Sequence, residues 1–140
     1  MAIETVLKSH PRKTLIELHS FVSCIEACIQ CAETCTSCAD ACLAEERVQT
    51  LRKCIRLDLD CADICRTTAR ILTRQTEPEP QFMRILLDVC VTMCGLCARE
   101  CETHAEMHRH CRICAEACRE CERNSRQLLA ELPGGAGLAH

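Results

Sequence analysis

Cysteines are the residues of this chain with the clearest chemical potential: there are 17 among 140 residues, many at alternating gaps of four and three. Such gaps place side chains on one stripe of an α-helix, so the spacing predicts helices that each carry a line of thiols on one face. Four series are visible: Cys24, Cys28, Cys31, Cys35, Cys38 and Cys42; Cys54, Cys61 and Cys65; Cys90, Cys94, Cys97 and Cys101; Cys111, Cys114, Cys118 and Cys121.

A cysteine content this high is typical either of a disulfide framework in an oxidising compartment or of metal binding in a reducing one. The N-terminal segment MAIETVLKSHPRKT contains acidic Glu4 and has no apolar run of signal-peptide length. Nothing downstream approaches a membrane span, so we expect a cytoplasmic protein with reduced thiols. An odd number of cysteines cannot all pair internally, which leaves a disulfide-stabilised interaction module as the weaker alternative.

The composition argues against two classes of partner and indicates which residues fill the core. The formal net charge is −3, with no basic stripe for nucleic acid and no basic amphipathic face for a membrane. The chain has no Trp, no Tyr and two Phe, so aromatic side chains cannot fill its core and cysteine is the candidate to replace them. Its length suits one domain.

Helix-forming residues dominate, and the fold class predicted is all-α, an antiparallel up-down-up-down four-helix bundle with a thiol-lined core. Pro11 suits a helix start, and Thr14 with Glu17 could form a capping box. Pro78 and Pro80 end the second helix, and a turn near residues 103–108 avoids one helix too long for a compact domain. The expected single domain is 1–132, with helices at about 12–43, 46–75, 81–103 and 108–131, followed by a flexible tail at 133–140.

The thiols occupy alternating halves of the four helices, and in such a bundle these halves lie at the same end. Each helix thus has a seam, the line of positions at gaps of three and four that faces the core. Continuing each seam away from its cysteines gives apolar residues, so the other half of the core should be hydrocarbon. The turns at the thiol end carry further soft and intermediate ligands. The apolar positions are Leu18, Phe21, Leu72, Met83, Leu87 and Leu128, and the turn residues are His104, Met107, His108 and His110.

Asp58 lies where the second helix lacks a seam cysteine between Cys54 and Cys61. This position predicts a polar ligand or the point where the seam meets water, and a solvated surface aspartate is an equal alternative. The histidines and Met107 could hold Cu(I) weakly and pass it inward, or could be ordinary surface and packing residues.

Several chemistries use thiols, and the pattern favours Cu(I). Zinc needs four converging ligands, and several tetrathiolate zinc centres would bury excess negative charge. Cu(I) is soft, is satisfied by two or three sulfurs, and cancels one thiolate charge per ion. Iron–sulfur binding remains a competitor because Cys24, Cys28 and Cys31 have the CxxxCxxC spacing of radical-SAM enzymes, although the helical period explains that spacing too. A core that merely uses cysteine as a small hydrophobe fits two or three thiols, not this many in register, and no thiol stands apart as a catalytic nucleophile.

Three stretches resemble a known family: CADAC at 38–42, CIRLDLDCADIC at 54–65 and HAEMHRHCRICAEACREC at 104–121. They are similar to the cytosolic branch of the bacterial copper storage proteins, over roughly residues 8–131. The resemblance implies a four-helix bundle, assembled as a homotetramer, that holds many Cu(I) ions on its thiolates without catalysing a reaction. We therefore expect all 17 cysteines to be metal ligands and the capacity to be on the order of 17 ions per chain. An iron–sulfur or zinc–thiolate protein is the alternative function.

Overall fold

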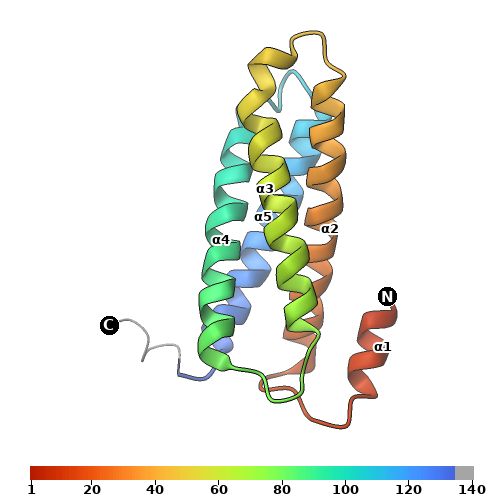
Figure 1. The fold of residues 1–140 in the computed structure, drawn as a ribbon, viewed down its shortest axis with the longest axis vertical. Helices are drawn as coiled ribbons and strands as arrows, with labels where there is room; N and C mark the ends of the chain where they lie inside the picture. The colour runs from red at the N-terminus through yellow and green to blue at the C-terminus, as the bar shows by residue number, and fades with distance from the viewer. Residues whose placement is uncertain (135–140) are drawn as a thin grey trace.

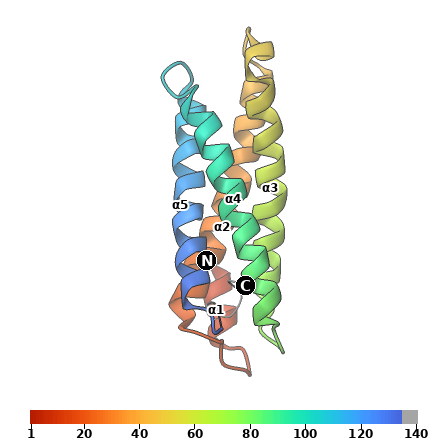
Figure 2. The same ribbon diagram turned by 90° about the vertical axis from the view of Figure 1, so that its left-hand side faces the viewer.

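Four long helices form the body of the molecule in the computed structural model, which describes residues 1–134 (Figure 1). They run alternately up and down (Figure 2), and a short helix, α1, lies beside the lower part of the bundle (Figure 1). The helices are α1 (Ala2–Lys8), α2 (Leu18–Leu43), the 3-10 helix η1 (Val48–Leu51), α3 (Arg52–Leu72), α4 (Pro80–Glu102) and α5 (Arg109–Glu131). Residues 1–134 contain no strand, which agrees with the predicted all-α bundle.

The bundle is closed because each helix packs against two neighbours: α2 against α3 and α5, and α4 against α3 and α5. Two connections, 44–51 and 103–108, lie at one end of the bundle, and the α3–α4 connection lies at the other (Figure 1). The expected break between the last two helices is confirmed, and the predicted bounds of α4 and α5 differ from the observed ones by one residue at most.

The start of the first bundle helix was predicted wrongly. The helix begins at Leu18, not near residue 12, and no side chain caps it at Glu17. The Thr14 hydroxyl, expected to belong to a capping box, instead donates to the carbonyl oxygen of Ile16 within the preceding loop. The backbone N–H of Arg12 donates to His10 Nδ1 over 2.9 Å, so side chains hold this segment in turns that compete with a helix.

Two further differences concern the chain ends and the second helix. Helix α1 was not expected; its Leu7 is buried against the core, with Ile3 partly buried beside it.

The helix predicted at 46–75 is shorter in the structure, because Val48–Leu51 form a 3-10 turn and α3 ends at Leu72. Most of the predicted flexible tail, residues 135–140, lies outside the described part of the chain.

Helix α4 is the one helix in residues 1–134 that is long and apolar enough to cross a membrane, whereas the sequence expectation was that no segment comes close. This is weak evidence for a span, because buried helices of globular proteins share the property. Half of its most apolar window is buried by the neighbouring helices. One wall of a packed core therefore accounts for its composition.

The core has two chemically different halves, as the seams predict. At the end opposite the two connections the interior is hydrocarbon, and Phe21, Leu72, Leu87 and Leu128 are fully buried there. Met83 is buried with them, and Leu18 packs at the edge of the same cluster. The remaining length of the core is lined mainly by cysteine.

Candidate metal centre

A column of thiols fills the core from the hydrocarbon half to the end that carries the two connections. All 17 cysteines are free and buried, and even the most accessible, Cys38, is only 2% exposed. The cysteines come from the C-terminal two thirds of α2, from the N-terminal halves of α3 and α5, and from the C-terminal half of α4. The structure therefore confirms that the predicted thiols meet in one region of the bundle.

Sulfur atoms from different helices are in contact along this column. Cys35 on α2 lies 3.6 Å from both Cys114 and Cys118 on α5. Cys65 on α3 lies 3.5 Å from Cys94 on α4 and 3.8 Å from Cys121 on α5. Such distances allow one metal ion to reach sulfurs from two or three helices after a small adjustment of rotamers.

The thiols form overlapping groups of four, in which the ligand atoms lie within 4.8 Å of one another. Neighbouring groups share members, since Cys31, Cys35 and Cys118 each belong to two of them. The arrangement is therefore a continuous set of bridging positions, not a row of isolated four-ligand sites. Four of the groups are Cys31–Cys65–Cys94–Cys121, Cys31–Cys35–Cys61–Cys118, Cys35–Cys97–Cys114–Cys118 and Cys38–Cys42–Cys54–Cys111.

Asp58 lies inside the column, so the solvated-surface alternative is wrong. Its carboxylate oxygen Oδ1 accepts from the Sγ of Cys97 at 3.1 Å, Cys114 at 3.2 Å and Cys101 at 3.5 Å. Asp58 also forms a potential ligand group with Cys38, Cys54 and Cys101. Burial, followed by the charge of nearby thiolates, raises the pKa of Asp58 to about 11.

In the absence of metal, a thiol whose pKa is raised mainly by burial keeps its proton. Burial raises the pKa of Cys42, the last cysteine of α2, to about 12. A metal ion that binds such a thiol must displace its proton, because the thiolate is the form that coordinates metal. Metal uptake by the column is therefore coupled to proton release.

One histidine reaches the thiols at the open end of the column. His110 Nδ1 lies 3.4 Å from Cys38, 3.6 Å from Cys111 and 3.9 Å from Cys42. Its other nitrogen, Nε2, lies 2.8 Å from a carboxylate oxygen of Glu45, a residue that the sequence pattern did not single out. His110 is the first side chain at this end that could offer a nitrogen ligand together with sulfur.

The other predicted entry residues occupy different places. His108 lies on the rim, stacked on His110 with ring centroids 5.4 Å apart, and its Nδ1 lies 3.1 Å from Glu45. His104 contacts Glu100 at 3.0 Å. Met107 is 76% exposed, which contradicts the alternative that it packs against a neighbouring helix.

The inner end of the column is closed by a hydroxyl group. Ser125 is fully buried, and its Oγ lies 3.5 Å from Cys90, 3.6 Å from Cys24 and 4.0 Å from Cys121. The sequence analysis missed this residue, although its position four residues after Cys121 continues the α5 seam. Beyond it lies the hydrocarbon half, with Phe21, Leu72, Leu87 and Leu128.

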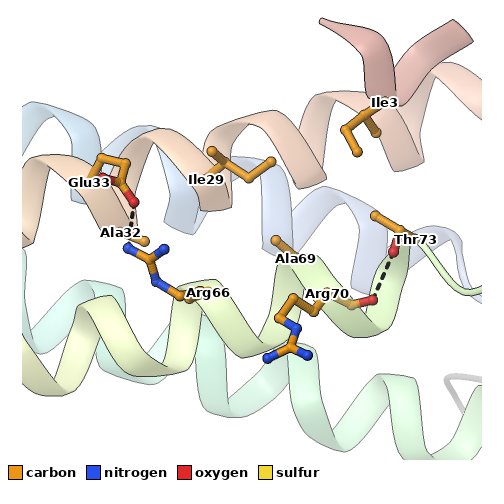
Figure 3. Close-up of a pocket in the computed structure, with 8 residues that line it drawn as sticks. All are labelled: Ile3, Ile29, Ala32, Glu33, Arg66, Ala69, Arg70 and Thr73. Atoms are coloured by element: carbon orange, nitrogen blue, oxygen red, sulfur yellow. Dashed lines mark hydrogen bonds and ion pairs between the residues drawn. The ribbon is translucent and has the colours of Figure 1, made fainter. Parts of the chain in front are cut away.

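A groove of about 340 Å³ lies on the outside of the bundle between α1, α2 and α3 (Figure 3). Ile3, Ile29 and Ala69 line it, and Arg66 pairs with Glu33 at its edge. No cysteine faces this groove, and it is separate from the thiol column.

Known proteins share both the sequence pattern and this fold. A family model described as copper storage protein matches residues 17–130. A copper storage protein, Ccsp, from Streptomyces lividans, solved with 10 copper equivalents, is 46% identical with a TM-score of 0.91, covering 93% of this chain and 99% of its own. A structure of a cytosolic copper storage protein from Streptomyces lividans with five coppers is 52% identical with a TM-score of 0.81, over 81% of this chain and 95% of its own. The Cu(I)-bound copper storage protein BsCsp3 is 36% identical with a TM-score of 0.70, over 79% of this chain and 98% of its own.

Proposed function

Because the chain belongs to the copper storage protein family, we propose that it stores many Cu(I) ions on the thiolates of its bundle core and catalyses no reaction. The observation that carries this proposal is the unbroken column of 17 buried free thiols, whose sulfur atoms contact one another across all four helices. Solved relatives loaded with copper support the same conclusion.

Charge explains why such a column suits Cu(I). A bound Cu(I) replaces a thiol proton with one positive charge, so a column with as many ions as thiolates stays neutral in a low-dielectric core. Shared cysteines are also an advantage, because each thiolate can bridge two ions. Full loading would correspond to about 17 ions per chain on this basis.

Zinc and iron–sulfur binding fit the geometry less well. A tetrathiolate site uses four sulfurs, and adjacent groups in this core compete for Cys31, Cys35 and Cys118. Several such sites would therefore leave incomplete ligand sets between them, and each zinc tetrathiolate would add about two buried negative charges.

We propose that all 17 cysteines are Cu(I) ligands and that Asp58 takes part in metal binding in the middle of the thiol column. Its Oδ1 contacts three thiols, so Asp58 could bind Cu(I) directly once its own proton is displaced, as for the thiols around it. We assign entry to the end with His110, where nitrogen and sulfur meet, with His108 and His104 on the rim and Met107 outermost.

The cellular location and the assembly belong to the same proposal. The Streptomyces lividans relative is a cytosolic protein, which supports a cytoplasmic store. An outward stripe on α4, formed by Phe82, Ile85, Val89 and Leu96, is exposed and apolar, which suits contact between copies of this chain. We propose that these copies form a homotetramer in solution. The double variant Phe82→Glu and Val89→Glu should then form smaller species, and light scattering measures the change in mass. As a control, a double substitution of exposed glutamates should leave the mass unchanged.

Titration tests the storage function. The fully reduced protein is titrated anaerobically with Cu(I) against a competing chelator, and we expect saturation at about 17 equivalents. Saturation at one to four equivalents would overturn the proposal. Visible absorption of the protein as isolated anaerobically, and a count of free thiols without reductant, would reveal an iron–sulfur or a disulfide protein.

A further inference from the structure

Glu45 connects the two histidines at the entrance of the thiol column. It lies in the connection after α2, whereas His108 and His110 lie at the start of α5, far away in the sequence. Its Oε2 atom is 2.8 Å from His110 Nε2 and 3.1 Å from His108 Nδ1. One carboxylate oxygen therefore faces a different ring nitrogen of each histidine.

The chemistry of a carboxylate determines where the histidine protons must be. Glu45 is an ionised carboxylate at neutral pH, because its side chain is 33% exposed to water and a glutamic acid in water loses its proton well below pH 7. An ionised carboxylate only accepts hydrogen bonds, so both nitrogens that face it carry hydrogen. In its neutral form His110 then has its lone pair on Nδ1, and neutral His108 has its lone pair on Nε2.

The consequence for His110 is visible in the structure. The nitrogen left without hydrogen, Nδ1, is the one that lies 3.4 Å from Cys38 and 3.6 Å from Cys111. A metal-binding histidine typically donates its other N–H to a carboxylate, which fixes the tautomer and the ring orientation. The contact between Glu45 and His110 has this form.

We propose that Glu45 is a positioning residue for copper entry: it fixes His110 with Nδ1 and His108 with Nε2 free to accept an incoming Cu(I). This inference rests on the proposed storage function. His108 and His110 are 16% and 25% exposed at their side chains, so an ion arriving from solvent can reach them before it meets buried sulfur.

The tautomers can be measured without copper. Long-range ¹H–¹⁵N correlation spectra of the reduced apo protein at a pH where the histidines are neutral should show His110 protonated on Nε2 and His108 protonated on Nδ1. Free imidazole side chains favour hydrogen on Nε2, so the assignment of His108 is the diagnostic one. Hydrogen on Nε2 of His108, or on Nδ1 of His110, in the wild-type protein would overturn the proposal.

A variant pair then tests the effect on entry. Glu45→Ala should return His108 to the Nε2–H tautomer and slow transfer of the first Cu(I) equivalent from a chelator about 10-fold, in line with the loss of a partner that orients a metal ligand. Glu46→Ala is the matched control, because Glu46 is the exposed neighbour and makes no contact with either histidine among the interactions of the described chain. Equal rates for the two variants would refute a role of Glu45 in entry. A low copper capacity of the wild-type protein would instead refute storage, whatever the tautomers are.

Discussion

Asp58 on α3 and Cys114 on α5 meet in the middle of the core, where the Sγ of Cys114 donates to Oδ1 of Asp58 over 3.2 Å. Asp58 is fully buried, and no cation pairs with it among residues 1–134. Because burial raises its pKa to about 11, the folded apo protein keeps this carboxyl protonated at neutral pH.

This carboxyl should make the apo protein less stable as the pH rises. In the unfolded chain an aspartate loses its proton above about pH 4, whereas the folded state retains it up to about 11. Between these values the unfolded state binds fewer protons, so the free energy of unfolding falls by up to about 1.4 kcal/mol per pH unit. Asp58→Asn should remove this contribution, so the free energy of unfolding of the variant should fall less than that of the wild-type protein between pH 5 and 7.5. This range is chosen because the thiols of the unfolded chain titrate above it. Urea unfolding of both reduced proteins checks the slopes, and parallel slopes would contradict the assignment.

The hydrocarbon half should carry most of the apo stability. Leu87 and Cys94 are both fully buried on the same face of α4, two turns apart, so they form a matched pair. Leu87→Ala should lower the free energy of unfolding by about 3 kcal/mol, as expected for a large cavity in a packed core. Cys94→Ala removes one sulfur atom and should cost about 1 kcal/mol. Urea unfolding in the absence of copper measures both, and a larger loss for Cys94→Ala would show that the thiols support the fold.

Ser125 sets the inner limit of the thiol column. Ser125→Cys places an eighteenth thiol beside Cys24, Cys90 and Cys121 and should raise the capacity by about one Cu(I). Ser125→Ala is the control, because it removes the hydroxyl without adding a ligand, and its capacity should not rise. The idea fails if chelator competition gives the same capacity for the serine and cysteine proteins.

His110 and Met107 should differ in their effect on copper transfer. His110 contacts three thiols, whereas Met107 points into solvent. His110→Ala should therefore slow uptake of the first equivalents about 10-fold, and Met107→Ala should have little effect. Stopped-flow transfer from a coloured Cu(I) chelate measures both rates, and a slower Met107→Ala would place the entrance elsewhere.

The sequence predicted the thiol column well because the period of a helix leaves a direct mark on residue spacing. Gaps of three and four define the buried faces, and the same phase made a seam position for Asp58 one of two equal alternatives, between which its burial decides. The N-terminal segment was less predictable, since Thr14 can cap a helix or hydrogen-bond within a loop, and only packing decides between them.

Contacts between segments that are distant in sequence could not be predicted in this way. Glu45 acquires its role only because the connection after α2 lies against the start of α5, and no local pattern records that approach. The orientation of Met107 depends likewise on the path of a short turn. Ser125 is different, because extending the α5 seam by four residues from Cys121 would have found it.

The division of the core along its length has an evolutionary consequence. Each additional seven residues in the four helices would add two further layers of ligand positions, one per gap of three and one per gap of four, while preserving the phase of every seam. The apolar end, with Phe21, Leu72, Leu87 and Leu128, could remain unchanged while this happened. Capacity could therefore increase or decrease in whole-heptad steps through insertions and deletions, without the need to invent a new fold for each size of store.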